Sequence, residues 1–71
     1  MKEYLVIFKL AGDNYSAYVP DLPGCITTGK TLDETEANIR KAISPYIDTI
    51  REEGTPVPEP ITKAKLISVA A

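Results

Sequence analysis

The chain has 71 residues, with ten acidic side chains, eight basic ones, a net charge of −2 and no histidine. This length allows one small domain with a thin core, and the lack of histidine excludes Ser-His triads and Cys/His zinc sites. The acidic balance argues against a general phosphate-binding surface and favours a basic protein partner. Cys25 is the only cysteine, which fits a reducing cytoplasm, and no apolar run approaches the ~20 residues that span a bilayer.

The N-terminal part predicts a β-hairpin. Residues 3–10, EYLVIFKL, form an apolar run in which one face of a strand holds Tyr4, Val6, Phe8 and Leu10 and the other holds Leu5 and Ile7. A Gly-Asp-Asn turn leads into residues 15–19, YSAYV, as the second strand. Because the first strand is apolar on both faces and one helix covers only one of them, we expect a homo-oligomer interface or another partner on the second face.

A proline-rich stretch, YVPDLPGC, follows the second strand. Pro23 and Gly24 suit the centre of a type II turn, and Asp21 can accept hydrogen bonds from nearby backbone N–H groups. These residues predict a rigid bend, which would also suit a recognition loop because little entropy is lost on binding. A reaction at Asp21 and Cys25 is disfavoured, since no base or cationic activator lies near them in the sequence.

The remaining chain predicts a short strand, one long helix and a last strand. Residues 25–28, CITT, are rich in β-branched side chains, and Thr31 with Glu34 forms a capping box for a helix from residue 32 to about 53. The apolar stripe of this helix is predicted to comprise Leu32, Ile39, Ala42, Ile43, Tyr46, Ile47 and Ile50. Pro45 predicts a bend or a break inside that helix. After a proline-rich linker, residues 65–70 predict a fourth strand. The expected fold is one α+β domain over residues 1–71, in the order β-β-β-α-β, with a small antiparallel sheet and one helix on one face.

The charged and aromatic residues offer two weaker alternatives. A nuclease-like Mg²⁺ site could draw on Asp13, Asp21, Asp33, Glu34, Glu36 and Asp48. Asp33 and Glu34 are neighbours on a helix and point ~100° apart, so they do not converge, and we expect neither a metal nor a cofactor. RNA bases could stack on Tyr4, Phe8, Tyr15 and Tyr18, although alternating strand residues of this kind are more often core or interface.

As a whole, the pattern resembles a known family. The stretch from Tyr15 to Glu34, Y-x-x-x-V-P-D-L-P-G-C-x-T-x-G-x-T-L-D-E, resembles the signature of HicB-like antitoxins, and E-E-G-x-x-x-P at residues 52–58 continues it. The resemblance implies a trimmed RNase H-like fold, dimers or tetramers, and a cytoplasmic antitoxin that binds and masks a small basic HicA-type toxin, an mRNA-cleaving ribonuclease.

The sequence departs from the family pattern in three places. It ends at Ala71 without the C-terminal DNA-binding domain of many members, so we expect no direct DNA binding. Pro45 interrupts a helix that usually lacks proline, and Thr35 stands where alanine is common. The first strand lacks the interior aspartate that RNase H chemistry needs, and the protein is therefore predicted not to be an enzyme.

Two functions follow from these observations. The first is an antitoxin-like protein whose predicted partner-binding residues are Pro20, Asp21, Leu22, Pro23, Gly24, Cys25, Asp33 and Glu36. The alternative is an orphan homo-oligomeric domain with weak RNA binding or RNase H-like nuclease activity.

Overall fold

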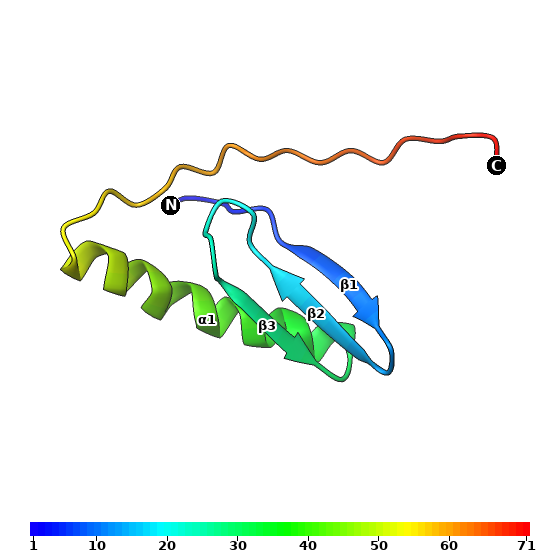
Figure 1. Cartoon of the computed structure of the whole chain (residues 1–71), viewed down its shortest axis with the longest axis horizontal. Coiled ribbons are helices and arrows are strands. Elements are labelled where there is room, and N and C mark those ends of the chain that lie inside the picture. Colours follow the sequence, from blue (N-terminus) through cyan, green and yellow to red (C-terminus); the bar gives the residue numbers. More distant parts are fainter.

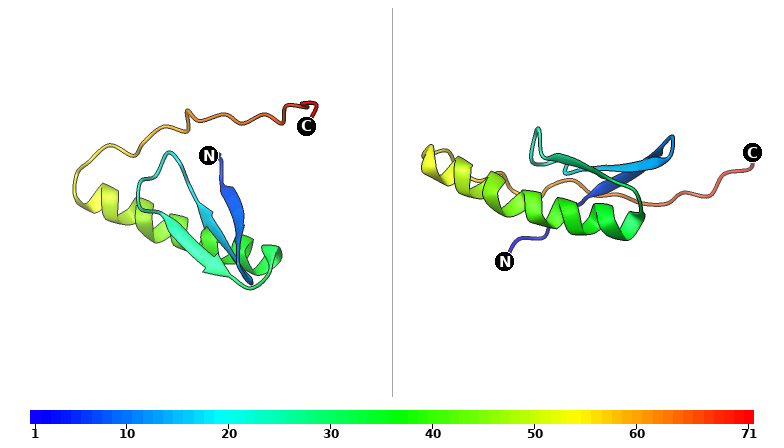
Figure 2. Two further views of the ribbon diagram at one scale, coloured as in Figure 1. Left: turned by 45° about the vertical axis from the view of Figure 1, so that its right-hand side comes forward. Right: turned by 90° about the horizontal axis from the view of Figure 1, so that it is seen from below.

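The computed structural model describes residues 1–71 and contains three strands followed by one helix. The strands are β1 (Ile7–Ala11), β2 (Asn14–Tyr18) and β3 (Ile26–Gly29), and the helix is α1 (Leu32–Glu52). The strands form one sheet in the order β1-β2-β3, with both pairs antiparallel. The helix lies across one face of this sheet, as the second view in Figure 2 shows most clearly. The α+β class and the order of the first four elements are confirmed.

The sheet register places small and apolar residues toward the helix. Phe8 lies opposite Ala17, which in turn lies opposite Thr27. Ala17 has no exposed surface, so the helix packs directly on the middle strand. Gly12, at φ 62°, and Asp13 form the two-residue connection between β1 and β2, which fixes this register.

The helix begins at the predicted cap and runs without interruption. The Thr31 hydroxyl accepts a hydrogen bond from the Glu34 N–H at 3.0 Å. The Glu34 carboxylate accepts from the N–H of Lys30 at 2.8 Å, one residue earlier than the capping-box prediction. Pro45 does not break the helix, because its exposed position lets the ring face solvent and only one backbone hydrogen bond is lost.

A small core lies between the helix and the sheet. The buried apolar residues are Ala17, Val19, Leu22, Cys25 and Ile39. Further side chains pack around them while staying partly exposed: Tyr4, Val6, Phe8, Ala42, Ile43 and Tyr46. The prediction that Leu32 buries its side chain with the apolar stripe is wrong, because this first helical residue is 48% exposed.

Thr35 takes a core position near the start of the helix. Its side chain is fully buried, and its hydroxyl donates to the Thr31 carbonyl at 2.7 Å. Because the buried hydroxyl is hydrogen-bonded, the burial of this threonine carries little desolvation penalty.

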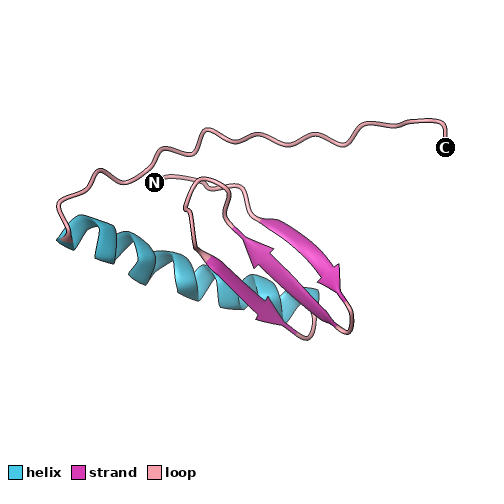
Figure 3. Ribbon diagram, viewed as in Figure 1, coloured by secondary structure: helices cyan, strands magenta, loops and turns pink.

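The predicted fourth strand is not formed. Residues 53–71 follow the helix as an extended segment without a helix or strand, drawn as loop in Figure 3. A strand requires a backbone partner, and residues 65–70 have none within the chain. The prediction of β-β-β-α-β is corrected to β-β-β-α. The helix α1 is not long and apolar enough to span a membrane.

Candidate partner-binding site

The stretch between β2 and β3 is a tightly hydrogen-bonded loop. We call residues 20–24 the PDLPG loop. Val19 donates its N–H to the Cys25 carbonyl at 3.1 Å, which closes the loop at its base. Two further backbone bonds, Leu22 to Val19 and Cys25 to Leu22, each measure 3.0 Å. Gly24 has φ 82°, a conformation that side chains with a Cβ rarely adopt. The loop is therefore a specified bend.

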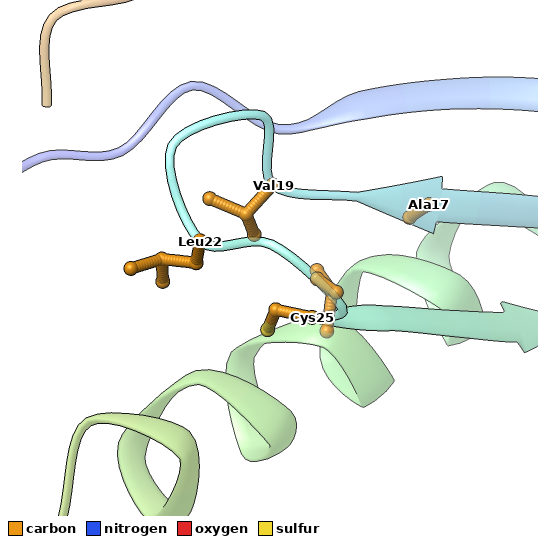
Figure 4. Packing of buried hydrophobic residues seen from close by; sticks show 5 residues of the cluster. Ala17, Val19, Leu22 and Cys25 are labelled. Atoms are coloured by element: carbon orange, nitrogen blue, oxygen red, sulfur yellow. The ribbon is translucent and has the colours of Figure 1, made fainter. Parts of the chain in front are cut away.

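Two of the six contact residues predicted at positions 20–25 point inward. Leu22 has no exposed surface and Cys25 is 4% exposed, and both lie beside Val19 in the core (Figure 4). Burial raises the pKa of the Cys25 thiol above its ordinary value of 9.0, which keeps it protonated at neutral pH. These two residues support the fold from within and offer no surface to a partner.

Asp21 joins the loop to the C-terminal segment. Its carboxylate accepts two hydrogen bonds from Thr62, one from the hydroxyl at 2.6 Å and one from the backbone N–H at 3.0 Å. The hydroxyl bond, followed by the backbone bond, lowers the pKa of Asp21 below its ordinary value of 3.8. The half-buried Asp21 carboxylate is therefore already hydrogen-bonded within the folded chain, to a residue 41 positions later in the sequence.

Tyr46 ties the other side of the loop to the helix. Its hydroxyl donates to the Pro23 carbonyl at 2.5 Å. Pro23 and Gly24 remain exposed, and Pro20 is half-buried. The surface that the loop presents is therefore a short, rigid tip held from both sides.

The two predicted acidic residues lie elsewhere on the molecule. Asp33 and Glu36 are exposed on the first turns of α1, and Glu36 accepts from the Arg40 guanidinium at 3.1 Å. The PDLPG loop precedes β3 whereas the helix follows it, so the two groups lie toward opposite ends of that strand (Figure 1). Four strand residues span ~13 Å, which separates the predicted site into two places.

Sequence reasoning missed the residues that hold the loop and the C-terminal segment. Tyr46 was assigned to the apolar stripe, although a partly buried tyrosine usually finds a partner for its hydroxyl, and this signal could have been used. Thr62 gave no signal, because its partner Asp21 is distant in sequence. A third tie joins the Tyr4 hydroxyl to the Pro58 carbonyl at 2.6 Å.

No three or more His, Cys, Asp or Glu side chains gather in a way that could hold a metal ion. The acids are distributed over the helix, the turns and the loop, and each of those described above has its own hydrogen-bonding or solvent environment.

Comparison with known proteins identifies relatives of the whole domain. A protein from Thermoplasma acidophilum, UPF0150 protein Ta0767, is 40% identical over 58 residues, which cover 82% of this chain and 84% of that protein. UPF0150 protein ssr1765 of Synechocystis is 38% identical over 67 residues, covering 93% of this chain and 85% of the relative.

A third relative is longer. An uncharacterized 14.9 kDa protein from the rep-hol intergenic region of Haemophilus phage HP1 is 36% identical over 56 residues, covering 79% of this chain but only 42% of the phage protein. No solved structure gives a significant match. Residues 4–70 match the family described as "HicB_like antitoxin of bacterial toxin-antitoxin system". Because this match spans nearly all of the sequence, the chain belongs to the HicB-like antitoxin family.

Proposed function

We propose that this protein is an antitoxin that binds a small, basic, mRNA-cleaving toxin of the HicA type and masks its RNA-binding site. The observation that carries the proposal is the family match over residues 4–70. A binding role without catalysis of its own is consistent with the carboxylates, which do not converge on one point.

The exposed start of the helix supports an electrostatic contact with such a toxin. Asp33 and Glu36 project from the first turns, and neither is buried by the rest of the chain. A toxin that binds RNA needs basic residues at its active surface, and these acids would oppose them. We assign the first contact to this acidic turn and a second to the exposed tip, Pro23 and Gly24.

The remaining predicted contact residues act through the fold. Leu22 and Cys25 are buried, and Asp21 is engaged by Thr62. They hold the tip in one conformation, which reduces the entropy lost when a partner binds. Masking would be steric: the antitoxin occupies the surface that the toxin uses for RNA, while the opposed charges set the orientation and speed of encounter.

A charge-reversal experiment tests the assignment of the acidic turn. The double variant Asp33→Lys and Glu36→Lys changes this turn, and the control Glu52→Lys with Glu53→Lys makes the same change in net charge. Glu52 lies ~28 Å from Asp33 along the axis, since a helix rises ~1.5 Å per residue.

Titration calorimetry with the protein encoded beside this chain measures both variants against the unaltered protein. We expect the first to weaken binding by about tenfold or more and the control by much less. Equal affinities within about twofold for the first variant and the unaltered chain would contradict the assignment. Failure of the unaltered chain to bind that neighbour, or to stop its RNA cleavage, would contradict the antitoxin function itself.

Two measurements test the alternative functions, direct RNA binding and nuclease activity. Affinity for single-stranded RNA that falls steeply with salt would indicate an RNA contact. A rise in melting temperature with Mg²⁺ would indicate a metal site of the RNase H kind. The trimmed RNase H-like fold itself stays a prediction, because the structure has three strands and lacks the fourth.

A further inference from the structure

The last residues of the chain form an exposed segment with the character of a β-strand. We call residues 63–71, KAKLISVAA, the C-terminal arm. Its largest apolar side chains are almost fully in solvent: Leu66 is 104% exposed, Ile67 80% and Val69 77%. No backbone hydrogen bond outside the helix and sheet involves a residue beyond Thr55, so the arm's N–H and C=O groups have no partner within the chain.

The base of the arm is fixed, and the arm itself leaves the body of its own domain. Thr62 is held by Asp21, and Glu59 pairs with Lys2. Beyond this point the segment diverges from β1 and ends away from the sheet, as Figure 1 and the left view of Figure 2 show. The radius of gyration is 13.9 Å. A compact chain of this length would have ~11 Å. The arm therefore projects from the domain and does not pack against it.

One edge of the sheet is open to a further strand. β1 pairs only with β2, and its two-residue turn places the N–H and C=O groups of Phe8 and Leu10 on the side facing away from β2. The opposite edge differs, because the Asn38 amide donates to the Thr28 carbonyl of β3 at 2.9 Å. An added strand would pair with β1.

Apolar surface flanks this open edge on both faces of the sheet. On the helix side, a groove of about 540 Å³ runs between the N-terminal segment and α1, and Val6, Phe8 and Ile43 contribute to its lining. On the other side, Ile7, Tyr18 and Ile26 lie in one cross-strand row. A strand added beside β1 would place alternate side chains toward each of these surfaces.

Charge indicates which molecule supplies that strand. The arm holds Lys63 and Lys65 and no acid, so residues 1–62 carry six basic and ten acidic side chains. A basic toxin would repel the arm, whereas the acidic body of the same protein attracts it. Since the fixed base directs the arm away from its own β1, we propose that the C-terminal arm adds as a strand to the β1 edge of a second copy of this chain, reciprocally, in a two-fold symmetric dimer.

Two variants separate the arm from the edge that receives it. A chain ending at Thr62 lacks the arm but keeps the Asp21 contact. Leu10→Pro keeps the arm but removes one outward N–H of β1, a position where an edge strand tolerates proline. Leu10 is 64% exposed, so Leu10→Ala is the matched control that loses the side chain and keeps the N–H.

Light scattering after size-exclusion chromatography gives the expected pattern. The unaltered chain and Leu10→Ala should have twice the 7.7 kDa chain mass, and the two blocking variants should be monomers. Mixing the two monomeric variants should restore a dimer containing one of each, because one has the arm and the other has the edge. Circular dichroism confirms that each variant is folded.

Three results would overturn the proposal. The first is an unaltered chain that stays monomeric. This result counts against the proposal whether hydrogen exchange shows the backbone amides of the arm to be unprotected or protected by pairing with β1 of the same chain. The second is a chain ending at Thr62 that still forms the dimer. The third is a mixture of two folded blocking variants that stays monomeric. None of these measurements involves the toxin, so the proposal stands or falls separately from the antitoxin function.

Discussion

Replacement of Leu22 by alanine tests whether the PDLPG loop is part of the core. Leu22 lies in a proline-rich turn that the sequence alone would place at the surface, yet its side chain has no exposed area. Its neighbours in the core are Val19, Cys25 and Ile39, so removal of its branched end would leave a space that the hydrogen-bonded loop is poorly able to fill.

The expected cost follows from that burial. Three carbon groups are lost at ~0.8 kcal/mol each, and the cavity term raises the total to about 3 kcal/mol, within the 2–5 observed for buried Leu→Ala changes. A domain of this size has an unfolding free energy of roughly 4–10 kcal/mol. The substitution should therefore remove a large part of the stability and lower the melting temperature by about 12–24 °C.

Urea unfolding followed by circular dichroism measures this change. Ile26→Ala is the matched control, because Ile26 is also an aliphatic residue next to the loop but is 63% exposed, and it should cost well under half as much. If Leu22→Ala costs less than about 1 kcal/mol, or no more than the control, then Leu22 is not a core residue and the loop is a mobile surface segment.

Three further predictions concern the contacts around the loop. The N–H resonance of Thr62 should shift with pH at a midpoint below 3.8, the ordinary pKa of an aspartate, because the hydrogen bonds from Thr62 lower the pKa of Asp21. The contact therefore stabilises the fold above pH 3.8, and this stability is lost as the pH falls through the folded-state pKa. Asp21→Asn should abolish the pH-dependent shift, and a midpoint above 3.8 would contradict the contact. Tyr46→Phe removes the bond to the loop and should cost about 0.5–1.5 kcal/mol in urea unfolding, more than Tyr18→Phe, whose hydroxyl has no such bond; equal costs would refute it. Cys25 should react with a thiol reagent only as fast as the core opens, and a rate like that of free cysteine in the native protein would show that the thiol is accessible.

Local sequence signals were sufficient for the elements whose residues interact with near neighbours. The Gly12 turn and the alternating side chains around it predict the β1–β2 hairpin, because period-two patterns and a tight turn act within a few residues. The cap at Thr31 likewise predicts where α1 begins. Helix propagation then outweighed the single bond lost at Pro45, so the helix continued to Glu52.

The candidate site was predicted less completely, because its residues are defined by contacts distant in sequence. Proline, glycine and aspartate in the PDLPG loop correctly predict a rigid bend. Which of its side chains face inward depends on how the loop meets the helix, and this is why Leu22 and Cys25 appeared as contact residues. The two acids at the start of α1 were grouped with the loop, although β3 separates them.

The sequence by itself determined the hairpin, the capped helix, the rigid bend and the resemblance to an antitoxin family, since each is written in residues close together along the chain. Only the tertiary structure decided that Asp21 holds Thr62 and that the C-terminal arm leaves the domain. The arm has the pattern of a strand, but a strand also needs an edge to pair with. No local pattern specifies which edge that is, because the partner's backbone is brought into place only by folding or association.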